Sequence, residues 1–73
     1  MFSLGKTIAD LRREKGHNQK FLAISSGIDK TTYSRIENGT RGVCDEELKA
    51  IASVLDLSTD HIIFEWQQRY LTR

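Results

Sequence analysis

The chain has 73 residues, no proline, one cysteine and a formal net charge of +1, and 38% of its residues are hydrophobic. This length suits one domain spanning residues 1–73, and the single cysteine excludes an internal disulfide, which favours a reducing, cytoplasmic location. No apolar run approaches the ~18 residues of a membrane span, and the N-terminus is too polar for a signal peptide. We therefore expect a small domain with no membrane partner.

Charge is distributed unevenly along the chain. Residues 1–43 hold eight basic and four acidic residues, a net charge of +4, whereas residues 44–73 hold three basic and six acidic residues, a net charge of −3. A polyanion would bind the basic half, and the acidic half would face away from it.

The first two predicted helices lie in the basic half. One runs from Ser3, a suitable N-cap, to Lys15, and the following glycine suits a left-handed C-terminal position. The other follows Asn18, also an N-cap type, and covers residues 19–26 before Gly27 ends it.

Three more helices complete the pattern. The third begins at Asp29 and ends at Asn38-Gly39, and the fourth covers residues 45–55 with an apolar stripe at i, i+3, i+4 and i+7. The fifth begins near Ser58. No stretch shows the alternation of a strand, so we predict an all-α, compact five-helix bundle.

The connection between the second and third helices is only Gly27, Ile28 and Asp29. A connection this short makes the two helices cross steeply, as in a helix-turn-helix. We expect the glycine to adopt the turn and Ile28 to form an apolar plug beneath both helices.

The third helix has a polar outer face. Tyr33 and Ile36 are three residues apart and face inward, whereas the outward positions are Lys30, Thr31, Ser34 and Arg35. All four outward side chains are hydrogen-bond donors, and Arg or Lys reads guanine while Thr contacts the thymine methyl group in the major groove. These four residues are therefore predicted to read DNA bases.

The segment "LRREKGHNQKFLAISSGIDKTTYSRIENGTR", followed by "LKAIASVLDLSTDHI", resembles the Cro/C1-type (XRE) family of helix-turn-helix regulators. The resemblance covers about residues 4 to 63. It implies a lambda-repressor-like DNA-binding domain that contacts the DNA backbone through Gln19, Thr32, Asn38 and Arg41. It also implies a buried structural ion pair between Arg12 and Glu37, which joins the first helix to the third.

Three residues depart from the pattern of the family. His17 replaces an apolar residue, and Cys44 places a thiol near the N-cap of the fourth helix. Tyr33 replaces a small aliphatic residue, and we expect its ring to pack while its hydroxyl reaches water or a phosphate.

Enzymatic and metal-binding functions have little support. The chain has no CxxC motif, no paired-histidine spacing and no phosphate-binding glycine loop. We predict no catalytic residue, no metal site and no cofactor, and we assign His17, His61 and Cys44 to structural or surface positions.

The C-terminal segment 64–73 is predicted to be a helical extension. Core packing is expected to take Ile62, whereas Ile63, Trp66 and Tyr70 are predicted to form a dimer interface. Core packing and docking of a second protein are the alternatives for these three residues.

The function predicted from the sequence is that of a homodimeric, sequence-specific transcriptional repressor that binds a pseudo-palindromic double-stranded DNA operator. The resemblance implies a cytoplasmic protein of a bacterium, associated with the nucleoid, or of a phage or mobile element, with autoregulation as one mode of control. RNA polymerase and a cognate toxin are the further partners considered. The alternative is a protein-interaction module on the same fold, such as an antitoxin that binds mainly its partner.

Overall fold

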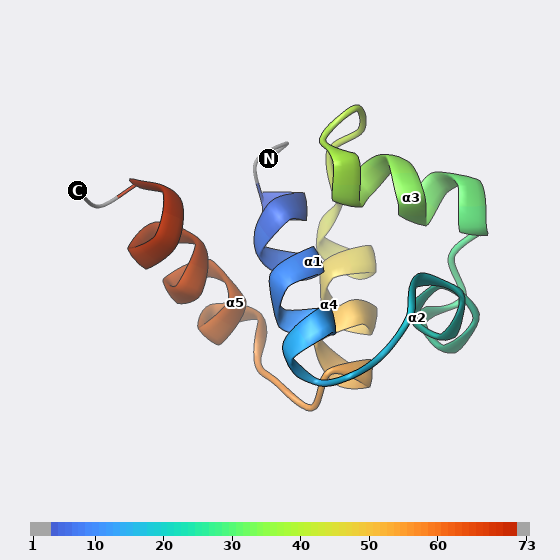
Figure 1. Ribbon diagram of the computed structural model, residues 1–73, viewed down its shortest axis with the longest axis horizontal. Helices are drawn as coiled ribbons and strands as arrows, with labels where there is room; N and C mark the ends of the chain where they lie inside the picture. The colour runs from blue at the N-terminus through green and yellow to red at the C-terminus, as the bar shows by residue number, and fades with distance from the viewer. Residues whose placement is uncertain (1–3, 72–73) are drawn as a thin grey trace.

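The computed structural model describes residues 4–71, which form five α-helices and a terminal π-helical turn (Figure 1). The elements are α1 (Leu4–Glu14), α2 (Gln19–Ser26), α3 (Lys30–Asn38), α4 (Asp45–Val54), α5 (Thr59–Trp66) and the π-helix η1 (Gln67–Leu71). The all-α, five-helix prediction is confirmed, and η1 continues the axis of α5 to the end of the described chain. None of the helices in residues 4–71 has the length and apolar character that a membrane span needs.

Polar side chains begin three of these helices, as their sequences predict. The side chain of Asn18 accepts the Phe21 N–H at 2.8 Å, and Ser58 accepts the His61 N–H at 3.0 Å. Asp29 starts α3 in the same way, whereas the predicted cap Ser3 lies outside the described residues. Each cap satisfies backbone donors that have no partner within the helix, which sets where the helix begins.

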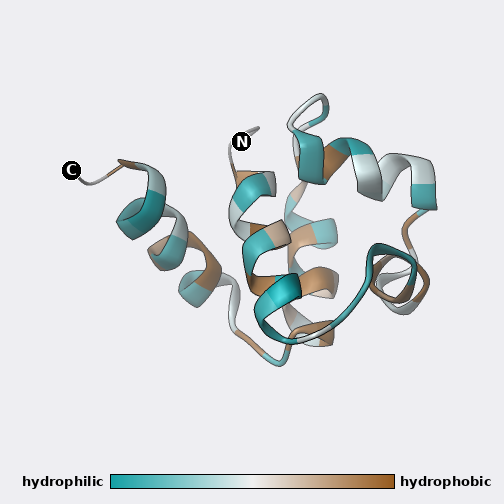
Figure 2. Ribbon diagram, viewed as in Figure 1, coloured by the Kyte–Doolittle hydropathy of each residue, from teal (hydrophilic) through white to brown (hydrophobic). Residues whose placement is uncertain are grey.

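The core is one cluster of apolar side chains drawn from all five helices. In Figure 2 the brown, hydrophobic bands of α1 and α4 lie within the bundle, whereas α3 is mostly teal and white. Ile8, Leu22, Ile51 and Ile62 at the centre of the cluster have no measurable exposure. Burial of this surface provides most of the stability of a domain without disulfides.

α1 and α3 approach each other closely at Gly5. A Cβ atom at this position would lie 1.8 Å from the carbonyl oxygen of Ile36, so only glycine fits without a backbone shift. This contact fixes one end of α3 against the bundle, and nothing in the sequence pattern identified it.

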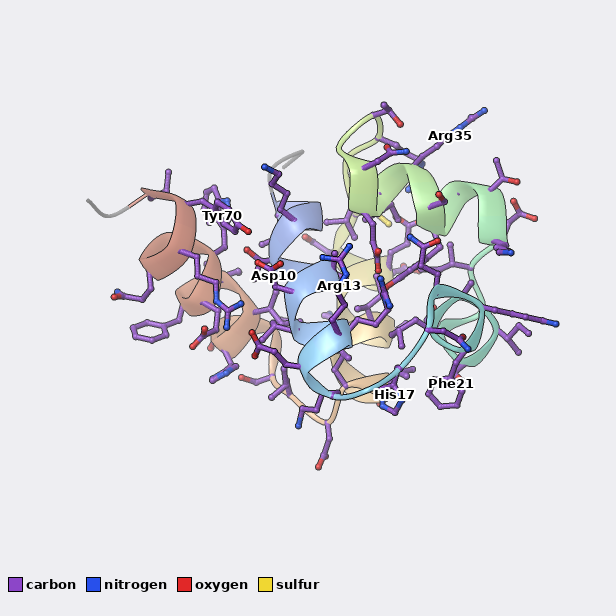
Figure 3. The ribbon with its side chains drawn as sticks, in the orientation of Figure 1. Asp10, Arg13, His17, Phe21, Arg35 and Tyr70 are labelled. Atoms are coloured by element: carbon purple, nitrogen blue, oxygen red, sulfur yellow. The ribbon has the colours of Figure 1, made fainter. Side chains whose placement is uncertain are left out.

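The C-terminal segment packs against α1. Arg69 pairs with Glu14 at 2.8 Å and with Glu65 at 3.0 Å, and the Tyr70 hydroxyl donates to Asp10 at 2.6 Å. Figure 3 shows Tyr70 beside Asp10. These contacts hold η1 at one end of the long axis of the molecule, and α2 and α3 lie at the other end (Figure 1).

Candidate nucleic-acid interface

The connection between α2 and α3 is a tight left-handed turn. Gly27 has φ of +74° and donates its N–H to Ile24, while Ile28 donates to Ala23 at 2.9 Å. Ile28 is half-buried and packs against the core, as predicted for a plug beneath the two helices. The Asp29 carboxylate then accepts the N–H groups of Thr31 and Thr32 and starts α3. This turn determines the direction in which α3 leaves the bundle.

α3 has one buried side and one open side. Tyr33, Ile36 and Glu37 are buried, whereas Lys30, Thr31 and Arg35 are exposed and Ser34 is half-buried. Figure 3 shows Arg35 extending away from the body of the molecule. Five of the predicted DNA-contacting residues line one open groove of about 540 Å³: Gln19, Lys30, Thr31, Ser34 and Arg35.

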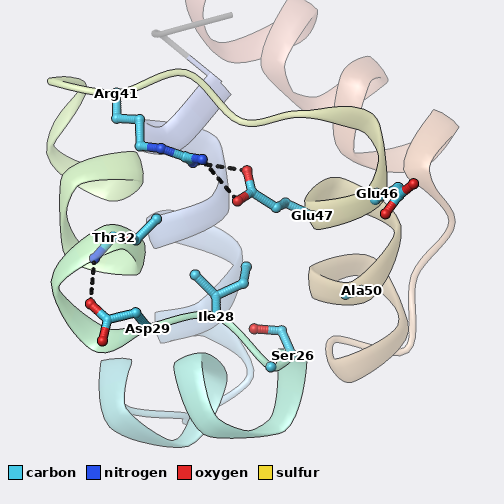
Figure 4. Close-up of a pocket in the computed structure, with 9 residues that line it drawn as sticks. Ser26, Ile28, Asp29, Thr32, Arg41, Glu46, Glu47 and Ala50 are labelled. Atoms are coloured by element: carbon cyan, nitrogen blue, oxygen red, sulfur yellow. Dashed lines mark hydrogen bonds and ion pairs between the residues drawn. The ribbon is translucent and has the colours of Figure 1, made fainter.

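The other predicted backbone contacts lie elsewhere around α3. Thr32 and Arg41 line a second hollow of about 510 Å³, between α3 and the start of α4 (Figure 4). Asn38 closes the turn after α3, because its side-chain oxygen accepts the Thr40 N–H at 3.1 Å and the Thr40 hydroxyl at 2.8 Å. The predicted contacts therefore lie on both flanks of the exposed face of α3.

A buried polar network joins α1, α2 and α3 beneath this face. Arg12 donates to Glu37 through Nε at 2.7 Å and through Nη2 at 3.1 Å, which is the ion pair that the resemblance implies. Gln19 donates to the same carboxylate at 2.9 Å. Gln19 therefore links the candidate DNA groove to the buried ion pair.

Burial opposes the ionisation of Glu37, but its hydrogen bonds outweigh this effect. Donation from Arg12, Tyr33 and Gln19 holds the pKa of the Glu37 carboxyl below its ordinary value. The hydrogen bond to Glu37 in turn raises the pKa of Arg12 above its ordinary value. Both groups are charged at neutral pH, so the network is an ion pair with added donors.

The prediction for the Tyr33 hydroxyl is wrong. The ring packs as expected, but the whole side chain is buried, and its hydroxyl donates to Glu37 Oε2 at 2.5 Å instead of reaching water or a phosphate. Burial, and then the bond to Glu37, raises the pKa of Tyr33 above its ordinary value. The signal was present in the sequence, since positions 33 and 37 share one helix face.

The structure changes the interpretation of the C-terminal stripe. Trp66, predicted at a dimer interface, packs in the core and is only 7% exposed, so most of its surface is unavailable to a partner. Ile63 is partly buried, and Tyr70 is 38% exposed and bonded to Asp10 within the chain. The exposed apolar side chains of this segment are Phe64 and Leu71, at 52% and 58%, which the sequence reasoning missed.

His17 and Cys44, which were also singled out from the sequence, occupy structural positions. His17 lies against the Phe21 ring, with a centroid separation of 4.6 Å (Figure 3), and Cys44 occupies the N-cap position of α4. Within residues 4–71, no three histidine, cysteine or acidic side chains are grouped as a metal site would require.

Comparisons with known proteins agree with this geometry. The tight turn, the buried side of α3 and its open polar side together define a helix-turn-helix domain. Residues 8–62 match the helix-turn-helix family, and the chain belongs to this family, in its Cro/C1-type (XRE) branch. The resemblance inferred from the sequence is thus confirmed.

One curated relative matches most of this chain. The chain is 34% identical over 64 residues to an uncharacterized HTH-type transcriptional regulator, RghRB, of Bacillus subtilis (strain 168), covering 86% of this chain and 46% of that protein. The chain therefore spans about half the length of this curated relative.

Two solved structures are similar over most of the chain. The clp gene regulator ClgR from Corynebacterium glutamicum superposes with a TM-score of 0.86 at 26% identity, covering 90% of this chain and 70% of that one. A mutant of the restriction–modification controller protein C.Esp1396I has a TM-score of 0.84 at 29% identity, covering 94% of this chain and 90% of that one.

Proposed function

We propose that the protein is a sequence-specific double-stranded DNA-binding transcriptional regulator that places α3 in the major groove. The observation that carries this proposal is the free donor face of α3. Within residues 4–71, the side chains of Lys30, Thr31, Ser34 and Arg35 donate to no other residue, and they line one groove. A face of donors with no partner within the described chain suits the hydrogen-bond acceptors that base edges present in the major groove.

Roles follow from the chemistry of each side chain. Lys30 and Arg35 suit the O6 and N7 acceptors of guanine, and the Thr31 methyl group suits that of thymine. Gln19, Thr32, Asn38 and Arg41 flank this face and suit phosphate oxygens, which position the protein on the duplex without reading its sequence. Ser34 is half-buried and reaches a base edge only if α3 enters the groove closely.

The finer proposal is a homodimeric repressor. A two-fold axis beside α5 would present two α3 helices to one face of the duplex, and an operator with half-sites one helical turn apart requires them to be about 34 Å apart. Ile63 and Tyr70 remain candidates for this interface, together with the exposed Phe64 and Leu71. A dimer bound at an operator would block RNA polymerase sterically.

Selection of bound sequences from a random duplex pool tests this function. We expect a pseudo-palindromic site with half-sites about one helical turn apart. A salt titration on the selected duplex should give a slope of log K against log salt near −5, for about six phosphates contacted per dimer. Failure to bind any duplex at low salt would overturn the proposal and favour a protein-interaction module, such as an antitoxin.

A further inference from the structure

Arg41 leaves the turn after α3 and is held by the start of α4 (Figure 4). Its Nη1 donates to Glu47 Oε1 at 2.8 Å, and its Nη2 donates to Glu47 Oε2 at 3.0 Å. Nη1 also donates to the carbonyl oxygen of Gly42 at 3.1 Å. The guanidinium is therefore fixed by a two-bond contact with the Glu47 carboxylate and cannot rotate freely.

Two of the five N–H donors of the Arg41 guanidinium have no partner within residues 4–71. A guanidinium has five N–H donors in a planar fork, and three of those of Arg41 are used by Glu47 and Gly42. Within the described part of the chain, the Nε hydrogen and the outer Nη2 hydrogen have no partner, and both lie on one edge of the group. The side chain remains 41% exposed. That free edge has the two-donor geometry that binds a phosphate in a bidentate manner.

Glu47 is itself firmly held. Its Oε1 accepts the Cys44 N–H at 3.1 Å, which caps α4, and its side chain is only 18% exposed. The Arg41 hydrogen bond, together with that backbone bond, lowers the pKa of Glu47 to about 2, so the carboxylate is charged at neutral pH. Glu47 is thus a fixed anion anchored to a helix end, and Arg41 is the longer side chain oriented by it.

We propose that Glu47 is a positioning residue for DNA binding, which holds Arg41 so that its free Nε–Nη2 edge is directed to a phosphodiester beside α3. This inference rests on the proposed DNA-binding function and deepens it, because it assigns an acidic residue a favourable part in binding a polyanion. Charge alone predicts the opposite, namely that removing an acid strengthens binding to DNA.

The experiment compares Glu47→Gln with Glu46→Gln. Both variants lose one negative charge at adjacent positions that line the same hollow, but only Glu47 contacts Arg41. The probe is a labelled duplex of about 20 base pairs carrying two half-sites one turn apart, titrated at several salt concentrations. Thermal unfolding of each variant shows that binding is measured on folded protein.

We expect Glu47→Gln to weaken binding several-fold and to reduce the salt slope by about 1, as one lost phosphate contact would. Arg41→Ala should have a similar effect, and the double variant should lose little more than either single variant. Glu46→Gln should bind as tightly as the wild type or more tightly. A loss of unfolding temperature without a change in affinity or slope would show that Glu47 only caps α4, and would overturn the proposal.

Other outcomes are equally decisive. Tighter binding by Glu47→Gln than by Glu46→Gln would show that Glu47 competes with phosphate for Arg41, which also overturns the proposal. If Arg41→Ala binds like the wild type, the positioning role fails while the proposed function stands. Absence of wild-type binding at low salt would instead overturn the proposed function itself.

Discussion

Tyr33 is buried, and its hydroxyl donates to the Glu37 carboxylate beneath the exposed face of α3. Its inward position follows from helical spacing, but the direction of its hydroxyl depends on Glu37, whose carboxylate also accepts donors from α1 and α2. The side chain that we expected to touch water or phosphate is instead part of the core. A buried hydroxyl bonded to an ionised carboxylate is worth more than an exposed one.

The first prediction follows from this contrast. Tyr33→Phe keeps the ring and removes the donor to Glu37, so we expect the free energy of unfolding to fall by about 1.5–3 kcal/mol, measured by urea denaturation. Tyr70→Phe is the matched control, because it removes a hydroxyl that also donates to a carboxylate but from an exposed residue. An equal loss in the two variants would contradict the importance of burial.

A second residue-scale prediction concerns Gly5. A methyl group there meets the Ile36 carbonyl oxygen, so Gly5→Ala must shift α1 against α3, and we expect a loss of about 1–3 kcal/mol in unfolding free energy. Ser53→Ala, at an exposed position of α4, should change stability by less than about 0.5 kcal/mol. Unchanged stability of Gly5→Ala would show that the two helices separate without penalty.

At the scale of the element, α3 is held on one side and free on the other. Its inner side is fixed by Tyr33, Ile36 and Glu37, and its ends are set by the Asp29 cap and by Gly39, whose φ is +84°. The free side can be polar because, within residues 4–71, no other element of the protein packs against it. Base-reading and backbone-contacting residues on this element should therefore respond differently to substitution.

The third prediction tests this difference with Arg35→Ala. We expect it to reduce operator affinity by about 1–3 kcal/mol and to relax preference at one base pair, measured by binding to a panel of single-position operator variants. Lys49→Ala on α4 removes the same charge away from the groove and should leave sequence preference unchanged. An equal loss over the whole panel for Arg35→Ala would identify a phosphate contact instead.

The connection from α3 to α4 contributes a fourth prediction, on acid stability. The pKa of Glu47 is lowered to about 2 in the folded chain, from an ordinary value of 4.5. A lowered folded pKa stabilises the native state above the unfolded pKa, and this contribution is lost as pH falls from about 4.5 towards 2. The midpoint of urea unfolding should fall over this window, and Glu47→Gln should show a smaller fall.

Glu46→Gln is the control for this measurement, because Glu46 makes no ion pair within the described residues. It should keep the pH profile of the wild type. Identical profiles for Glu47→Gln and the wild type would mean that the Arg41 pair does not couple to folding.

At the scale of the whole molecule, the exposed α3 face and the C-terminal segment lie at opposite ends of a body 34 Å long. Trp66 completes the core of the monomer, while Phe64 and Leu71 remain exposed beside it. Folding and the proposed self-association should therefore depend on different residues of one segment. Large exposed apolar side chains gathered on a single segment are typical of an interaction surface.

The fifth prediction separates these two roles. Trp66→Ala should lower the unfolding free energy by about 3–5 kcal/mol, because it leaves a cavity in the core. Phe64→Ala should leave monomer stability nearly unchanged and shift the protein towards monomer in sedimentation analysis. A monomeric wild type at concentrations that saturate the operator would contradict the homodimer.

The helices, the tight turn and the polar outer face of α3 were all predictable from the amino-acid sequence. These features depend on local spacing and on cap residues such as Asn18 and Asp29, whose effects act within a few positions. The resemblance to the Cro/C1-type family added the Arg12–Glu37 pair. Trp66 could not be assigned by pattern alone, since core and interface positions share the same apolar stripe.

The contacts between side chains of different elements became visible only once the helices were packed together. The bond of Gln19 to Glu37, the Gly5 contact and the orientation of Arg41 by Glu47 each depend on two helices, or a helix and a loop, coming within a few ångströms. Helical periodicity specifies which way a side chain points from its own axis, but not what a neighbouring element places there. That is why the fold was predictable in outline, while the bond of Gln19 to Glu37 and the close contact at Gly5 were not.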